Sequence, residues 1–276
     1  MEKNSLPFEP FTVKPILETA EIIKSKNSSL VRFGDGEIDI INGKSIPYQK
    51  YTPELAQQLK TILETPSNEK CLIALPDVFE HRERYNTSAQ NFWMSHFQNY
   101  KDFYQNLVPS EWYATTFLSR PYIDLEDKAP ASKYFEAVRQ LWDKKEVLIV
   151  EGASSRSGVG NDLFENAAAV SRIICPSHHA FEKYNLILDA IKKQGKDKLI
   201  LLMLGPTAKV LAFQLAQEGF QALDIGHIDS EYEWYKMKAN YKVKLSSKHT
   251  AEHNYDTDIV FVQDESYEKS ILEIVE

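Results

Sequence analysis

Two carboxylates, Asp35 and Glu37, directly follow the short apolar run Leu30–Phe33, and a glycine stands before each of them. Hard divalent cations such as Mg²⁺ and Mn²⁺ prefer oxygen ligands of this kind. A site with one or two carboxylates also leaves coordination positions open for diphosphate oxygens and water. We therefore expect an acidic turn at residues 35–37 that holds a metal ion and a diphosphate together.

The spacing of this pair is weak support by itself, because the same Asp-x-Glu pattern recurs at Asp124 and Glu126 and at Asp229 and Glu231. The plain alternative is a polar turn that caps the next element. Position favours the functional interpretation, since ligands of open α/β sheets bind at the carboxyl ends of strands. Glycines beside the carboxylates also permit tight backbone geometry there.

A second polar segment, residues 151–162, follows the apolar run Val147–Val150 and precedes an expected helix. Its backbone N–H groups could receive phosphate oxygens, and an arginine could pair with a phosphate through two hydrogen bonds. The alternative is an ordinary loop in which Asn161 or Asp162 caps the helix. Because a tighter connection would suffice between a strand and a helix, we favour ligand binding. The expected contacts are Ser154, Arg156, Ser157, Gly158 and Asn161.

A third candidate joins Gly205 and Thr207, at the end of another apolar run, with the segment 224–231 after the next run. We expect Thr207 to cap its helix, with nucleotide contact as the alternative. His227 could hydrogen-bond a phosphate or an acceptor hydroxyl, and Asp229 could act as a general base or outer metal partner. A lone histidine at a strand end is more often structural, so this interpretation depends on its neighbours.

The aromatic-rich region 85–122 has two interpretations, a set of sugar platforms or ordinary packing. Phe and Trp at helical spacing usually bury area, so we expect packing, with Arg120 as the better candidate for a ligand contact. Cys71 and Cys175 stand in apolar, strand-like runs, and we expect buried free thiols.

Short apolar runs that alternate with helical patterns must position these residues. The runs predict buried strands of a mostly parallel sheet at Leu30–Phe33, Cys71–Leu75, Val147–Val150, Arg172–Cys175, Leu199–Leu204 and Ala222–Ile225. Helical spacing predicts helices at Pro53–Glu64, Ala131–Trp142, Phe181–Lys193 and Thr207–Gln217. The alternation predicts a Rossmann-like α/β fold. Residues 85–122 should add helices as a side wall, and the acidic tail after Gln263 should add another helix.

Composition limits the classes of function. Among the 276 residues, 43% are hydrophobic and 26% are charged, which is typical of one folded unit, so we expect a single domain over residues 1–276. The net charge of -8 argues against a nucleic-acid-binding surface. The sequence shows no signal peptide and no long apolar segment, so we expect a cytoplasmic protein without a membrane span. The oligomeric state stays open.

Four segments together resemble the GT-D-type glycosyltransferases, a bacterial family formerly classed as a domain of unknown function. They are Arg32–Glu37, Ser154–Asp162, Leu204–Thr207 and Asp224–Asp229. The resemblance implies a Rossmann-like fold, a UDP-sugar donor and a divalent metal, Mn²⁺ or Mg²⁺, held at Asp35 and Glu37. It also implies a glucosyltransferase that extends a glycan on a bacterial surface glycoprotein, with UDP-glucose as the favoured donor.

The expected site follows from the motifs and the resemblance together. The acceptor hydroxyl needs an orienting group or a base, and the candidates are Glu37, His227 and Asp229. The expected donor contacts are Arg32, Gly34, Ser154, Arg156, Ser157, Gly158, Asn161, Gly205 and Thr207. A non-catalytic nucleotide-binding module and a metal-dependent nucleotide phosphohydrolase are the alternatives.

Overall fold

The protein is built on one eight-stranded sheet, seen in a computed structural model that describes residues 6–250 and 252–276. The strand order is β3-β2-β1-β7-β6-β4-β5-β8, and every pairing between neighbouring strands is parallel. The strands are β1 (Ser29–Arg32), β2 (Cys71–Leu75), β3 (Ala114–Thr115), β4 (Glu146–Gly152), β5 (Ala169–Cys175), β6 (Leu199–Met203), β7 (Ala222–Asp224) and β8 (Ile271–Ile274). The predicted Rossmann-like, mostly parallel sheet is therefore confirmed.

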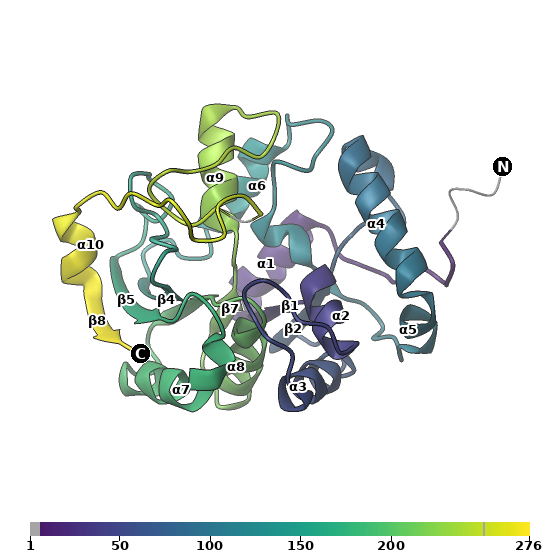
Figure 1. Ribbon diagram of the computed structural model, residues 1–276, viewed down its shortest axis with the longest axis horizontal. Helices are drawn as coiled ribbons and strands as arrows, with labels where there is room; N and C mark the ends of the chain where they lie inside the picture. Colours follow the sequence, from purple (N-terminus) through teal and green to yellow (C-terminus); the bar gives the residue numbers. More distant parts are fainter. Residues whose placement is uncertain (1–5, 251) are drawn as a thin grey trace.

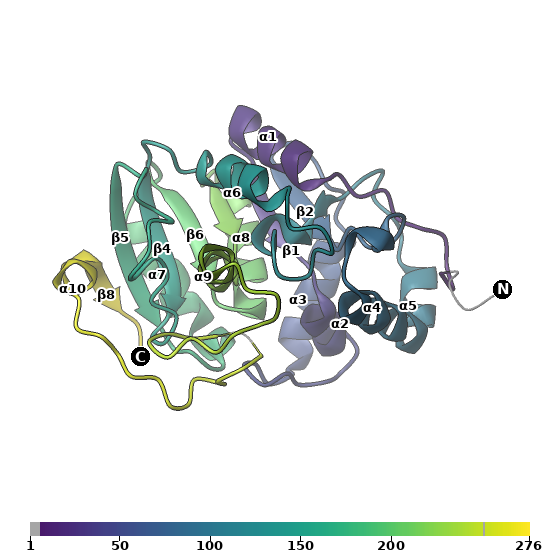
Figure 2. The ribbon, with the colours of Figure 1, turned by 90° about the horizontal axis from the view of Figure 1, so that it is seen from above.

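Helices cover both faces of this sheet. They are α1 (Ile16–Lys26), α2 (Asp35–Ile41), α3 (Pro53–Leu63), α4 (Thr87–Asn99), α5 (Lys101–Asn106), α6 (Ala131–Arg139), α7 (Tyr184–Lys193), α8 (Pro206–Gln217), α9 (Ile228–Met237) and α10 (Glu265–Ser270). Figure 1 shows α3, α7 and α8 in a row along the bottom of the view. In Figure 2, α1 and α6 lie together on the other side of the strands.

The strands are continuous apolar runs because they are covered on both faces. All five residues of β2 and all four of β1 are buried. The largest fully buried side chains include Trp142 and Trp234, which pack around the sheet. Cys71 and Cys175 are buried free thiols, as predicted.

The six predicted strands and four predicted helices are confirmed, with shifts of a few residues at their ends. Thr52 caps the start of α3, since its Oγ1 accepts a hydrogen bond from the Leu55 N–H at 3.2 Å. The tail forms the expected helix, α10, but also an unpredicted edge strand, β8. That strand was missed because only alternate residues are covered and Leu272 and Ile274 are exposed.

Two local predictions were wrong. Residues 35–37 are not a turn, because Asp35 begins helix α2 directly after its N-cap, Gly34. Acidic side chains in the first turn suit the helix dipole. The loop after β4 does not lead into a helix, and turns continue to β5. Positive φ angles at Gly158 (79°) and Gly160 (80°) direct the chain away from the right-handed helix.

The region 85–122 forms the expected side wall. Helices α4 and α5 stand beyond the β3 edge of the sheet (Figure 1). Its aromatics pack as predicted, with Trp93 and Phe97 buried, whereas Phe92 is exposed. No helix in the described ranges combines the length and apolar character that crossing a bilayer requires.

Candidate active site

A pocket of about 1130 Å³ opens across the carboxyl ends of the parallel strands. Its walls include residues at or just beyond the carboxyl ends of β1, β4, β5, β6 and β7. This is where open α/β sheets bind their ligands. Nine carboxylates and only four Lys or Arg side chains line it, so the pocket is strongly anionic. Eight of the predicted site residues line it together: Arg32, Gly34, Asp35, Glu37, Ser157, Gly205, His227 and Asp229.

Buried ion pairs form the floor of the pocket, where β1 and β7 lie side by side. Arg32 Nη2 lies 2.9 Å from Asp224 Oδ1, and Lys209 Nζ lies 3.1 Å from both Asp224 Oδ2 and Glu37 Oε1. These two cations hold the pKa of Asp224 below its ordinary value, although burial opposes them. Gly226 leaves room for the arginine, since a Cβ there would lie 3.3 Å from Arg32 Nη2.

Glu37 is fully engaged at this floor. Its Oε2 accepts a hydrogen bond from the Gly34 N–H at 2.8 Å, and its Oε1 faces Lys209. The carboxylate therefore caps α2 while it neutralises the lysine. A general base must lie within reach of the substrate hydroxyl and be free to take its proton. Glu37 already has two partners, the Gly34 N–H and Lys209, which compete with that role.

Asp35 is the open carboxylate of the pair. Its side chain retains contact with solvent inside the pocket and accepts no hydrogen bond from another described residue. The surrounding walls and then the negative charge of Glu37 raise the pKa of Asp35 above its ordinary value. A cation between the two carboxylates would reverse this effect, because an opposite charge favours the ionised form.

The donor set fits a divalent cation that shares its coordination with a ligand. Within residues 6–250 and 252–276, no three His, Cys, Asp or Glu side chains gather into a complete metal site. Asp35 offers free oxygens, and Glu37 could add one by releasing Lys209. Phosphate oxygens and water would then complete the shell, which is the usual arrangement for Mg²⁺.

His227 projects into the pocket from a strained position. Its backbone is left-handed (φ 73°) at the start of α9, which is uncommon for a non-glycine residue and clusters at functional sites. The side chain is exposed to the solvent of the pocket, yet desolvation by the surrounding walls, and then Arg120 and Arg32, lower the pKa of His227 well below its ordinary value. The imidazole is therefore neutral at pH 7 and can accept a hydrogen bond.

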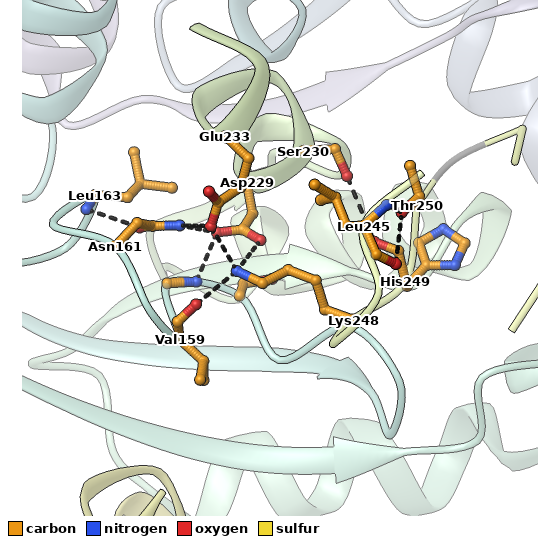
Figure 3. Close-up of polar contacts among 12 residues, drawn as sticks. Val159, Asn161, Leu163, Asp229, Ser230, Glu233, Leu245, Lys248, His249 and Thr250 are labelled. Atoms are coloured by element: carbon orange, nitrogen blue, oxygen red, sulfur yellow. Dashed lines mark hydrogen bonds and ion pairs between the residues drawn. The ribbon is translucent and has the colours of Figure 1, made fainter. Parts of the chain in front are cut away.

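Asp229 lies in a dense polar network (Figure 3). Its Oδ1 accepts hydrogen bonds from the Gly158 N–H and from Asn161 Nδ2, both at 2.8 Å. Its Oδ2 pairs with Lys248 Nζ at 2.9 Å. These contacts tie the loop after β4 to α9 and to the chain beyond it, so Asp229 holds three segments together.

The loop after β4 reaches the pocket through Ser155 and Ser157, whereas Arg156 points elsewhere. The Arg156 guanidinium packs 4.3 Å from the Tyr267 ring centroid and donates to the Val262 carbonyl at 2.7 Å. The structure thus brings Arg156 to the C-terminal tail and not to the predicted diphosphate site. Ser154, Gly158 and Asn161 support the loop from outside the pocket lining.

Thr207 does not cap its helix, so that expectation was wrong. Gly205 is the N-cap of α8, with a φ of 51°, and Thr207 lies inside the first turn. The Thr207 Oγ1 is buried and has no hydrogen-bond partner among the described residues. The capping prediction failed because Pro206 occupies the first helical position, which moves the N-cap to the glycine.

Several pocket residues escaped the sequence analysis. Lys209 is one of them, and its signal was a charged residue within the apolar helix Thr207–Gln217. Glu252, which lines the pocket, and Lys248, which lies behind the lining and pairs with Asp229, were missed because residues 240–256 carry no regular pattern. Glu252 lies 2.9 Å from Arg120; burial would raise the pKa of Glu252, but Arg120 and then Lys242 outweigh it and lower the pKa to about 2. Arg120 itself lines the pocket, and its contact with a ligand stays a prediction.

An open parallel sheet with a polar pocket across its carboxyl edge defines a Rossmann-like ligand-binding protein. Residues 30–253 match the family model described as the glycosyltransferase GT-D fold. The chain belongs to this GT-D family.

Proteins similar to this chain support the assignment. It is 52% identical over 261 residues to a probable glycosyl transferase Gly of Streptococcus gordonii, and 53% identical over 266 residues to the glycosyltransferase GlyD of Streptococcus pneumoniae serotype 4. The two matches include 95% and 96% of this chain, but only 38% and 33% of the length of the relatives. The chain thus spans about a third of the length of the curated relatives it matches.

Solved structures are similar over nearly the whole chain. One, described as the highly conserved domain of unknown function 1792 with a distinct glycosyltransferase fold, has a TM-score of 0.95 at 54% identity. The match covers 97% of this chain and 96% of that one. A structure described as a new glycosyltransferase from Streptococcus sanguinis has a TM-score of 0.94 at 51% identity, covering 96% and 100%.

Proposed function

We propose that this chain is a metal-dependent glycosyltransferase that moves glucose from a UDP-sugar to a glycan on a bacterial surface glycoprotein, in the cytoplasm. Membership of the GT-D family supports the class of reaction. The names of the two streptococcal relatives support it as well. The donor sugar, the metal and the acceptor rest on the resemblance and on the chemistry of the pocket.

One observation carries the proposal, which is the charge imbalance of the pocket. Nine carboxylates and four cations line it, and the two cations at its floor, Arg32 and Lys209, are already paired with Asp224 and Glu37. A diphosphate would add more negative charge to this surface. Like charges raise the free energy of such a complex, and a bound cation lowers it. A divalent metal between Asp35 and the diphosphate satisfies both partners.

Each floor residue has a defined task in this proposal. Asp35 and Glu37 hold the metal, and Arg32 with Lys209 fixes the position of Glu37 through the shared carboxylate of Asp224. The metal supplies electrostatic stabilisation of the UDP leaving group. Gly205 and Ser157 bring backbone and hydroxyl groups to the pocket wall, where they can contact the donor.

His227 is the best-placed group to orient the acceptor hydroxyl. Its neutral ring faces the pocket, while both oxygens of Asp229 and of Glu37 are engaged. A low pKa makes the imidazole a weak base in the free protein. Binding of an anionic donor offsets the nearby arginines and makes the ring more basic. We propose a positioning role for Asp229, because its carboxylate joins three segments.

The experiment is a transfer assay with purified protein, UDP-glucose, Mn²⁺ and a panel of glycans, read by mass spectrometry. We expect a product heavier by one hexose. Asp35→Asn keeps the side-chain shape but removes the charge, so transfer should fall by at least about 10²-fold. His227→Ala should lower kcat by about 10²-fold. The exposed His81→Ala variant is the matched control and should keep full activity.

The same assay separates the alternatives. UDP binding without any product across the panel would indicate a nucleotide-binding module. Release of phosphate without glycan modification would indicate a phosphohydrolase. Undiminished Mn²⁺-dependent transfer by the Asp35→Asn variant would refute the metal assignment.

A further inference from the structure

Exposed aromatic rings gather around the pocket. Within the described residues, five large aromatic side chains are exposed, and three of them line the pocket. These are Phe92 on α4, which is 48% exposed, and Tyr241 and Tyr255 in the chain after α9, which are 75% and 51% exposed. A ring left in solvent forgoes the favourable transfer out of water, and a ligand that covers the ring would recover that free energy.

Tyr255 is held firmly enough to act as a platform. Its ring stacks on the ring of Tyr48 with an interplanar angle of 16° and a centroid distance of 6.2 Å. Tyr48 in turn packs against His249, whose Nδ1 lies 2.7 Å from Asp256. Supported aromatic rings lose little conformational entropy when a ligand binds them.

These residues belong to a segment that we call the strap, residues 240–250 and 252–256, which passes along the pocket after α9. Lys248 pins it, because its Nζ lies 2.9 Å from Asp229, 3.0 Å from Glu233 and 2.7 Å from the Val159 carbonyl. Figure 3 shows these contacts converging on the lysine. These contacts fix the strap as one wall of the pocket.

The position of the rings indicates that they bind the acceptor glycan and not the sugar-nucleotide donor. The diphosphate belongs at the floor, beside Asp35 and Glu37, where the metal ligands are. The acceptor is part of a larger glycan and must reach the reacting atom from the solvent side. A glycan that arrives from the solvent side meets exposed lining residues such as Tyr241 and Tyr255.

Charge indicates the kind of sugar. The carboxylates of Asp124, Glu126, Glu252 and Asp256 line the same pocket as the rings. Arg120 and Lys242 line the pocket beside them, and Glu252 pairs with both cations. Carboxylates accept hydrogen bonds from sugar hydroxyls, but they repel a carboxylate or phosphate on a ligand.

We propose that the aromatic rim, formed by Phe92, Tyr241 and Tyr255, is an acceptor subsite that binds a neutral pyranose and excludes acidic sugars. The apolar face of the ring lies on the aromatic face, and the ring hydroxyls meet the carboxylates around it. This subsite rests on the proposed glycosyl transfer, because it takes the glycan that the reaction extends. Its binding of sugar needs no turnover and is therefore testable separately.

The test uses two probes that differ by one charge, methyl β-D-glucopyranoside and methyl β-D-glucopyranosiduronic acid. Saturation-transfer-difference NMR on the full chain reports binding of each through its ring protons. We expect a clear signal for the glucoside and a signal at least about fivefold weaker for the acidic probe. Tyr255→Ala and Tyr241→Ala should each reduce the glucoside signal at least about threefold. Tyr51→Ala, an exposed tyrosine outside the pocket, should leave it unchanged.

Equal signals from the two probes, or full signals in both pocket variants, would overturn the subsite. Saturating UDP with Mn²⁺ provides a further check. If UDP displaces the glucoside, the rings bind the nucleotide and the acceptor assignment is wrong; retained signal supports it. If UDP itself does not bind, the proposed donor is wrong, while the sugar result stands on its own.

Discussion

At the scale of single residues, the least expected group is Glu231. It is completely buried in α9, its Oε2 accepts the N–H groups of Tyr122 and Ile123, and its Oε1 has no partner among the described residues. Burial, and then the charge of Asp124, raises the pKa of Glu231 to about 7. The folded protein therefore keeps this proton more tightly than the unfolded chain does.

The raised pKa of Glu231 determines how the stability of the protein changes with pH. A carboxyl with a raised pKa favours the folded state while it is protonated, and this contribution is lost as the pH rises from its ordinary pKa toward 7. Glu231→Gln has no such proton. The free energy of unfolding of the variant minus that of the wild type should therefore increase by up to about 3 kcal/mol between pH 4.5 and pH 8. Urea unfolding at several pH values measures this, with the exposed Glu54→Gln as control.

A difference between Glu231→Gln and the wild type that stays constant from pH 4.5 to pH 8 would contradict the raised pKa. The control should show no more than a few tenths of a kcal/mol at any pH, because surface substitutions are usually within about 0.5 kcal/mol.

At the scale of elements, the strap depends on a single buried cation. Lys248 is 3% exposed and neutralises Asp229 and Glu233, which belong to α9. Breaking a buried ion pair by removing one partner leaves an uncompensated charge. The strap has no regular secondary structure of its own, so its position relies on such contacts.

Lys248→Met should therefore release the strap and lower the free energy of unfolding by about 3–5 kcal/mol. Hydrogen exchange followed by mass spectrometry should show faster exchange in the strap and in the loop after β4, with little change in β1 and β6. Lys244→Met removes a surface pair with Asp258 at 3.6 Å and serves as the control. Unchanged exchange in the strap of Lys248→Met would contradict this account.

At the scale of the whole molecule, the sequence predicted the layers better than the pocket. Apolar runs predicted six of the eight strands because buried parallel strands leave a clear pattern, whereas the two-residue β3 and the edge strand β8 leave almost none. Motifs at strand ends predicted part of the floor, namely Arg32 and Glu37, and they also predicted Asp35 and His227 in the pocket lining. They could not reveal that Lys209 would return to the floor one helical turn after Gly205.

Long-range pairing explains the remaining differences. Asp229 looked available as a base because its partner Lys248 comes 19 positions later, in a segment without periodicity. Arg156 resembled a phosphate ligand because its neighbours are small and polar, yet its guanidinium packs against the ring of Tyr267 in the tail. Such partners depend on tertiary structure that local spacing does not encode.

We propose that the anionic pocket binds a diphosphate only together with a divalent cation. Isothermal titration calorimetry of UDP with and without Mn²⁺ tests it most directly. We expect binding with Mn²⁺ that weakens at least about tenfold in EDTA, and a loss of similar size in Asp35→Asn even with Mn²⁺ present. Equally tight binding of UDP in EDTA, by the wild type and by Asp35→Asn, would contradict the account.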